Sequence, residues 1–326
     1  MKSLVLPVLH ELSHQRFVSG TVLAQKLHVS RSTISEILKE VAPFGIDIFS
    51  VPGRGYRLAR PLDMLDASAI QKMLQKATPP VQVEIMAHVD STNSELLRRA
   101  AQGEASGLCL AAEIQSQGRG RRGRRWESAL GSGLTFSLLW RFERGAAQLG
   151  GLSLVVGLAL VQTLRGVGIS RAQVKWPNDI WVDGQKLAGI LIETQGDMLG
   201  PSAAVIGIGI NYRLTDALKE QIDQPVCDIA AFLPQLPSRN ELLGSLLMQL
   251  AATLERFAQH GFTGWREEWI AAHALHEKPV CITHGDGTTL NAVVKGVAPD
   301  GALIVSAQGK EMMLTSGEIS LRINKK

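Results

Sequence analysis

The 326-residue sequence predicts an α+β protein built of several domains. Three patterns predict this architecture. Two short helix patterns and a hairpin pattern fill the first sixty residues. In the middle of the chain the strand patterns "GLCLAAEIQ" and "GLTFSLLWRF" follow each other with no helix pattern between them, so the sheet they join is mixed. Beyond residue 277, short strand patterns alternate with glycine-containing turns, which predicts a small all-β module.

The composition is that of a soluble globular protein with a sizeable core, because 45% of the residues are hydrophobic and 20% are charged. A net charge of +4 tolerates an anionic partner without requiring one. The three cysteines are scattered and form no CxxC pair. This pattern argues against a disulfide framework and a cysteine zinc site, and it fits a reducing cytosol.

No segment reads as a membrane span or a secretion signal. The opening "MKSLVLPVLHELSH" is interrupted by Pro7, His10 and Glu11, which makes it a poor signal peptide. The most apolar run, "LGGLSLVVGLALVQTLRGVG", carries glycines and reaches Arg165 too early to cross a bilayer. We therefore expect a buried helix there, and a cytoplasmic protein without a membrane partner.

The first module resembles a helix-turn-helix. Ser19 is placed to cap a first helix and Ser30 a second one, with the turn "HVS" between them. The second helix would enter the major groove of DNA with the small polar and basic residues at its start, which are Arg31, Ser32, Thr33 and Ser35. In "IDIFSVPGRGYRL", alternating residues about a Pro-Gly turn predict a hairpin whose Arg54 and Arg57 lie near phosphates as a wing. The alternative is a helical module that binds protein or has no partner.

The remaining elements follow from periodicity. "ARPLDMLDASAIQKMLQKATPP" predicts a linker helix that ends at two prolines. The central region mixes strand patterns with helix patterns. The strand patterns lie at 81–89, 107–115, 133–142, 173–182 and 203–212, and the helix patterns at 149–164 and 240–260. The stretch "FLPQLPSRNELL" suggests a surface loop. From about residue 277, the turns "HGDGT", "PDGA" and "QGK" separate short strands that should dock on the central domain.

The stretch "GRGRRGRRW" at 118–126 has five arginines among its nine residues. It satisfies G-x-G-x-x-G, but glycines and a strand pattern follow it where a dinucleotide fingerprint must open a helix. A nucleic-acid patch or a solvated basic loop would each account for the charge. A third explanation accounts for the glycines as well: a flexible loop that closes on an anionic small molecule. Activating a carboxylate with ATP brings two anions together, and arginine binds both carboxylate and phosphate oxygens bidentately.

Four further motifs carry polar residues at strand ends. "DSTNSE" at 90–95 follows a strand pattern and can also cap a helix. "KWPND" at 175–179 lies at a strand junction, "KLAGIL" at 186–191 starts another strand, and "GIGIN" at 207–211 ends one. Each motif alone is weak evidence. Together and in this order they are a specific set.

Taken with the arginine stretch, this set resembles the motifs of biotin–protein ligases. The N-terminal module and the terminal "GEISLR" make the whole chain similar to the bifunctional bacterial members, which also repress biotin-synthesis genes. The resemblance implies a winged helix at 1–62, a linker helix at 63–80, a ligase domain at 81–274 and an SH3-like barrel at 275–326. It also implies that biotin and MgATP form biotinoyl-5′-AMP, that biotin passes to a lysine of a carboxyl carrier protein, and that a ligand-bound homodimer binds operator DNA.

The resemblance further implies residue roles. Biotin would be held at its ureido end and ring by Ser91, Thr92, Asn93 and Gln115, and at its carboxylate by Arg119, Gly120, Arg121 and Lys186. The adenylate would contact Arg119, Arg121, Trp126, Lys175, Asn178, Asp179 and Asn211. Lys186 and Arg121 would be catalytic, Asp179 would assist the acceptor amine, and no residue is expected to be a dedicated metal ligand. Ala129 departs from the family pattern, where a proline is expected.

Three other interpretations stay open. A lipoate or octanoate ligase shares the fold, but it would lack the N-terminal module and the full arginine stretch. A transcription factor with a decayed ligase domain would sense biotinoyl-AMP without making it, and the presence of Lys186 and Arg121 argues against this. A ligase whose winged helix no longer binds DNA is compatible with every motif.

Overall fold

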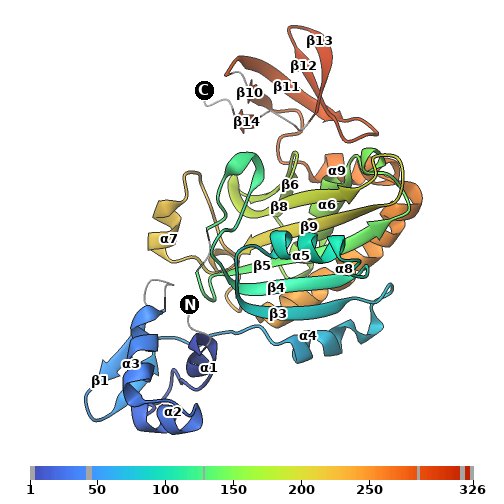
Figure 1. Cartoon of the computed structure of the whole chain (residues 1–326). Helices are drawn as coiled ribbons and strands as arrows, with labels where there is room; N and C mark the ends of the chain where they lie inside the picture. Colours follow the sequence, from blue (N-terminus) through green and yellow to red (C-terminus); the bar gives the residue numbers. More distant parts are fainter. Residues whose placement is uncertain (1–3, 42–45, 128, 285–286, 316–319, 324–326) are drawn as a thin grey trace.

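The computed structural model describes residues 4–41, 46–127, 129–284, 287–315 and 320–323. The described strands form sheets of two, seven and five strands, in the N-terminal, central and C-terminal parts of the chain (Figure 1). The mixed central sheet expected from the two consecutive strand patterns is confirmed. Its strand order is β3-β4-β5-β9-β8-β7-β6, with one parallel pair, β3–β4, among antiparallel neighbours.

The N-terminal module contains α1 (Val5–His10), α2 (Gly20–Lys26) and α3 (Arg31–Glu40), followed by the hairpin β1 (Ile48–Val51) and β2 (Gly55–Leu58). Ser19 and Ser30 cap α2 and α3 as expected, each accepting a backbone N–H with its side chain. The periodicity did not predict α1. Its Pro7 lies in the first turn, where a helix has no intrahelical partner for the missing N–H, so the proline does not interrupt the helix.

The central strands are β3 (Gln82–Val89), β4 (Leu108–Gln115), β5 (Gly133–Phe142), β6 (Gln173–Lys175), β7 (Asp179–Val182), β8 (Gln185–Gly196) and β9 (Ser202–Asn211). The single pattern at 173–182 thus divides into β6 and β7, with the turn of "KWPND" between them. The parallel pair β3–β4 is joined by α5 (Thr92–Ala101), which packs on one face of the sheet through Leu96 and Ala100.

The opposite face is covered by α6 (Leu152–Gly166) and α8 (Arg239–His260), and both belong to the main hydrophobic core. The most apolar run is therefore the buried helix that the sequence predicted, because most residues of α6 are buried. Within the part of the chain that the structure describes, no helix is both long and apolar enough to span a bilayer. Two shorter helices, α7 (Asp216–Gln221) and α9 (Arg266–Ala272), complete this region.

The linker helix is shorter than its pattern predicted. Only α4 (Ala67–Met73) is helical, with a 3-10 turn at Leu74–Lys76, because Asp66 caps the first turn by accepting the N–H groups of Ser68 and Ala69. Residues 63–65 are instead fixed by residues of the central region. The N–H of Leu65 donates to the Glu113 carboxylate at 2.6 Å, and Arg239 Nη1 donates to the Asp63 carbonyl at 2.7 Å.

Arg239 also contradicts the prediction of a surface loop at "FLPQLPSRNELL". Pro234 and Gln235 are exposed, but Arg239 is fully buried as the first residue of α8. Its Nη1 lies 2.8 Å from Glu113 Oε2, and both side chains are at most 1% exposed. A charged residue is almost never fully buried unless it is paired, and here the partner comes from β4, 126 residues earlier.

The C-terminal sheet consists of β10 (Pro279–Thr283), β11 (Thr289–Val297), β12 (Leu303–Ala307), β13 (Lys310–Leu314) and β14 (Ser320–Ile323). All its pairs are antiparallel, and the order is β13-β12-β11-β10-β14. Among the described strands no pairing joins β13 to β14, so the described pairings form an antiparallel sheet and do not show a closed barrel. Residues 317–319 of "GEISLR" lie outside the described part of the chain. The predicted docking is confirmed, since Val280 and Val294 share the central core.

Candidate functional site

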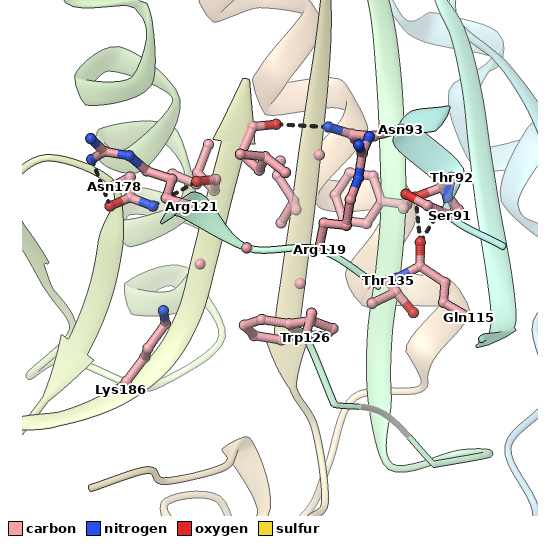
Figure 2. A pocket seen from close by; sticks show the side chains of 18 residues that line it. Ser91, Thr92, Asn93, Gln115, Arg119, Arg121, Trp126, Thr135, Asn178 and Lys186 are labelled. Carbon is pink, nitrogen blue, oxygen red and sulfur yellow. Dashed lines mark hydrogen bonds between the residues drawn. The ribbon is translucent and has the colours of Figure 1, made fainter. Parts of the chain in front are cut away.

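A pocket on the central sheet gathers ten of the residues singled out in the sequence, which are Ser91, Thr92, Asn93, Gln115, Arg119, Gly120, Arg121, Trp126, Asn178 and Lys186. Figure 2 shows Ser91, Thr92 and Gln115 grouped on one side, and Arg121, Asn178 and Lys186 on the other. The other three residues predicted to bind the adenylate line two adjoining pockets. Lys175 and Asp179 line one of these pockets and Asn211 lines the other, and Trp126 and Lys186 line both. Residues from four motifs and the arginine loop thus converge on one region.

The first side of the pocket is built on the start of α5. Ser91 is the N-cap of this helix, so the capping interpretation of "DSTNSE" is correct. The parallel pairing of β3 with β4 places Gln115 opposite Val89, beside that helix start. Gln115 Oε1 accepts two hydrogen bonds from Thr92, from its N–H at 2.7 Å and from its hydroxyl at 3.0 Å. These bonds fix the orientation of both polar side chains.

Asn93 is held by hydrogen bonds within the protein. Its Nδ2 donates to the Leu191 carbonyl at 3.1 Å and to Glu193 Oε2 at 2.8 Å, and its Oδ1 accepts from the Ser137 hydroxyl at 2.5 Å. Both donors and the acceptor are therefore engaged within the protein. Asn93 supports the pocket wall, and direct contact with a ligand stays a prediction. The sequence did not indicate Ser137 or Glu193, because their roles depend on partners at least 44 residues away.

The glycines of "GIGIN" are required by close contacts. A Cβ atom at Gly207 would lie 2.2 Å from Asn93 Oδ1, and one at Gly209 would lie 2.3 Å from Trp126 Cε2. Real Cβ atoms do not approach other atoms this closely, so both positions need glycine for Asn93 and Trp126 to reach the sheet. Glycine inside a strand signals such an approach, and this signal was present in the sequence.

The arginine loop, residues 118–126, lines the pocket and is held together by hydrogen bonds within its own backbone. The N–H of Trp126 donates to the Gly118 carbonyl at 2.9 Å, and that of Gly120 donates to the Arg124 carbonyl at 2.8 Å. After Gly120 there is one 3-10 turn at Arg121–Gly123 and then β5, which confirms that the stretch does not open a helix as a dinucleotide fingerprint would.

Two arginines of the loop are fixed at the pocket. Arg119 Nη2 lies 3.1 Å from Glu193 Oε2, and Arg121 Nη1 donates to Asn178 Oδ1 at 3.3 Å. Burial lowers the pKa of Arg121, while the charge of Asp179 opposes that change. Arg122, Arg124 and Arg125 are exposed.

On the same side of the pocket as Arg121, Lys186 Nζ lies 2.8 Å from Asp179 Oδ1, and Lys175 Nζ lies 3.9 Å from the same carboxylate. All three side chains are about 15% exposed. Asn211 Nδ2 donates to the backbone carbonyls of Lys186 and Cys227, at 3.2 Å and 3.0 Å. Asn211 thus holds the main chain of Lys186. With Arg121 nearby, one carboxylate faces three cations, which makes this side of the pocket suited to anions.

The second candidate surface is on the N-terminal module. Arg31 and Ser32 are exposed at the start of α3, and Thr33 and Ser35 are partly exposed. The wing arginines lie over aromatic rings. Arg54 is 4.7 Å from the centre of the Phe17 ring, and Arg57 is 4.9 Å from that of Phe49. Arg57 also donates to the His14 carbonyl, so it is more constrained than the exposed Arg54.

Comparisons with known proteins find a family match for the region that carries the pocket and another for the N-terminal module. Residues 85–211 match the biotin/lipoate A/B protein ligase family, and residues 6–57 match an HTH domain. The chain is 36% identical to the bifunctional ligase/repressor BirA of Salmonella typhimurium, over 99% of both chains. It is 32% identical to the biotin–[acetyl-CoA-carboxylase] ligase of Paracoccus denitrificans, over 72% of this chain and 98% of that one.

Among solved structures, the biotin protein ligase from Aquifex aeolicus in complex with biotin and ATP superimposes with a TM-score of 0.63 at 25% identity. The match covers 74% of this chain and 99% of that chain. This partial coverage contrasts with the nearly complete alignment to the bifunctional relative. On the full-length identity and the two matched domains, the chain belongs to the BirA family of bifunctional ligase/repressors.

Proposed function

We propose that this protein joins biotin to ATP as biotinoyl-5′-AMP, passes the biotin to a lysine of a carboxyl carrier protein, and represses transcription when the adenylate is bound. The observation that carries the proposal is the asymmetry of the pocket. A neutral hydrogen-bonding side at Thr92 and Gln115 faces a cationic side at Arg121 and Lys186. This arrangement suits a ligand with a polar uncharged ring at one end and a carboxylate at the other. The relatives of this protein named above are biotin ligases, and one of them was solved with biotin and ATP bound.

In the first step a biotin carboxylate oxygen attacks the α-phosphorus of ATP, and pyrophosphate leaves. The carboxylate is already a nucleophile, so this step needs no general base. Negative charge gathers between the carboxylate and the phosphate, where Lys186 and Arg121 would stabilise it together with Arg119. Trp126 would pack against the adenine, and Lys175, Asn178 and Asn211 would line the nucleotide side.

In the second step the acceptor lysine amine attacks the carbonyl carbon of the mixed anhydride, and AMP leaves. The attacking amine must lose a proton, and Asp179 is the nearest carboxylate to the cationic side of the pocket. We assign it the role of assisting that proton loss. Closure of the arginine loop would keep water from the anhydride until the acceptor arrives.

Magnesium would arrive with the phosphates of ATP. Among the described residues, no cluster of three or more His, Cys, Asp or Glu side chains could hold a metal ion. Asp179 is the carboxylate beside Lys186, and the two are paired. Mg²⁺ usually keeps several waters and binds through one or two carboxylates and substrate phosphates. The single carboxylate of Asp179 therefore fits an ion that is held mainly by the phosphates of ATP.

The ligase is tested by incubating the protein with labelled biotin, MgATP and a biotin carboxyl carrier domain. We expect ATP-dependent labelling of one lysine, with no label when that lysine is replaced by arginine or when ATP is left out. An excess of lipoate should not compete. Labelling with lipoate in place of biotin would favour the lipoate-ligase alternative, and no transfer of either would contradict the proposed activity.

Repression would follow from dimerisation. Ordering the 118–126 loop on the adenylate leaves a second subunit less conformational entropy to lose on docking, so ligand binding and dimerisation are thermodynamically linked. A dimer presents two copies of α3 to two half-sites, which raises affinity with no new contact per subunit. Biotin with ATP should therefore raise both the sedimentation mass and the affinity for a palindromic operator.

Arg31→Ala should lower operator affinity at least roughly thirtyfold, because a base-contacting arginine contributes about 1–3 kcal/mol at each half-site and the dimer contacts two of them. A gel shift with and without biotin and ATP measures the effect. Ligation by the variant should be unchanged. Lys39→Ala is the matched control, an exposed cation in the last turn of the same helix. Wild-type binding that ignores the ligand would overturn the repressor and leave the ligase intact.

The domain limits 1–62, 63–80, 81–274 and 275–326 belong to the same proposal, as does closure of the C-terminal sheet into an SH3-like barrel. Support for the barrel is the antiparallel five-stranded sheet, in which a register shift separates Val294 from Gly296 of β11, because such irregularities help a sheet to curve. We also place the protein in the cytoplasm, where biotin, ATP, carrier protein and operator DNA are all present.

A further inference from the structure

We propose that His273 is a positioning residue for the ligase reaction, which fixes the turn of "KWPND" by accepting a hydrogen bond from the backbone N–H of Trp176. The proposal rests on the proposed function, because the importance of the turn comes from its place in the candidate ligase site. His273 directly follows α9 and is only 4% exposed. Its Nε2 lies 3.3 Å from the Trp176 nitrogen.

His273 is itself held from two directions. Its ring stacks on Trp269, with 4.5 Å between ring centres and 29° between the planes. Its backbone forms a parallel bridge with Val174, and the next N–H, of Ala274, donates to the Val174 carbonyl at 2.8 Å. The segment after α9 therefore pairs with β6, which is the last strand of the seven-stranded sheet. A side chain fixed in this way can hold its neighbour in turn.

The turn connects this support to the pocket. Two residues beyond Trp176, Asn178 accepts from Arg121 of the arginine loop, and Asp179 pairs with Lys186. The turn has two further supports. The Trp176 indole donates to the Gly301 carbonyl at 3.0 Å, and the Ser153 hydroxyl donates to the Pro177 carbonyl at 3.1 Å. His273 is the only side chain recorded as accepting from the backbone N–H of Trp176 among the described residues, and Trp176 is 1% exposed.

The contact requires a neutral imidazole with its proton on Nδ1. Burial, together with the charges of His276, Lys175 and Lys278, lowers the pKa of His273 to about 3. A protonated ring would present an N–H to the N–H of Trp176, and two facing donors cannot bond. The environment thus keeps the ring neutral, and the contact with the Trp176 N–H assigns the acceptor role to Nε2. Nδ1 is buried and has no hydrogen-bond partner among the described residues. His273 does not reach the pocket, so its effect on the reaction is transmitted by the turn.

His273→Phe and His273→Gln separate the acceptor from the shape of the side chain. Phenylalanine keeps a ring to stack on Trp269 but leaves the Trp176 N–H buried without an acceptor. Glutamine supplies a neutral carbonyl oxygen. We expect His273→Phe to lower the kcat of biotin-dependent pyrophosphate release roughly tenfold, because an unsatisfied buried donor shifts the turn. The KM for biotin should change less than kcat, since the hydrogen bonds between Thr92 and Gln115 on the neutral side of the pocket involve no residue of the turn. His273→Gln should restore most of the loss.

Amide hydrogen exchange gives a readout that does not need ligase activity. The peptide covering residues 173–179 should exchange faster in His273→Phe than in the wild type, while His273→Gln should stay close to the wild type. Unchanged exchange in the phenylalanine variant, or equal kcat in both variants, would overturn the positioning role. A wild type with no pyrophosphate release would overturn the proposed function instead, and the exchange experiment would still decide the role of His273.

Discussion

Lys186→Ala is expected to lower the rate of biotin-dependent pyrophosphate release at least a hundredfold. The Lys186 ammonium is the cation closest to Asp179 at the pocket, and the Asn211 side chain fixes its backbone. It is thus preorganised where charge gathers between the carboxylate and the α-phosphate. Loss of one preorganised donor of this kind costs about 3 kcal/mol in the transition state. A continuous phosphate-release assay with added pyrophosphatase measures the rate.

Two comparisons make the result specific. Lys310→Ala removes an exposed lysine on β13 and should release pyrophosphate at the wild-type rate. Thermal unfolding of Lys186→Ala should show a folded protein, since the replaced side chain lies at a pocket and not in the core. If the alanine variant releases pyrophosphate at nearly the wild-type rate, Lys186 does not stabilise the transition state, and the cationic side of the pocket has another purpose.

Local sequence patterns predicted which motifs form the candidate site. Strand ends, helix caps and small polar residues are local features, so the positions of Ser91, Lys186 and Asn211 could be read from periodicity. The fold class was predicted for the same reason, because two consecutive strand patterns exclude a wholly parallel sheet. The family resemblance then supplied chemical roles that no pattern contains.

Features that depend on distant partners could not be predicted. Asn93 looked like a ligand-binding amide, but Ser137 and Glu193 engage it from two other strands. Nothing within ten residues of His273 indicates that Trp176 needs an acceptor. Arg239 lies in a stretch that suggested a surface loop, and arginine is mostly exposed in proteins. Each side chain is explained by the sheet register that brings its partner near, and single-sequence periodicity carries no register between distant strands.

Arg239→Met is expected to destabilise the ligase region by about 3–5 kcal/mol, because it leaves the buried Glu113 carboxylate without its cation. The variant also removes the donor to the Asp63 carbonyl, which anchors the linker. Urea unfolding followed by tryptophan fluorescence measures the loss. All six tryptophans lie between residues 126 and 269, so the signal reports this region and not the N-terminal module.

The double variant Glu113→Gln with Arg239→Met decides whether the uncompensated charge is the cause. Glutamine keeps an oxygen for the Leu65 N–H and removes the charge, so the double variant should recover most of the lost free energy of unfolding. Arg171→Met is the matched surface control. Its Nη1 lies 2.8 Å from Asp183 Oδ2, as close as the buried pair, but the side chains are 67% and 44% exposed. This pair should contribute less than about 1 kcal/mol, because water solvates either ion when the other is removed. Equal losses in Arg239→Met and in the double variant would show that the packing and hydrogen bonds of Arg239 dominate, and that its charge does not.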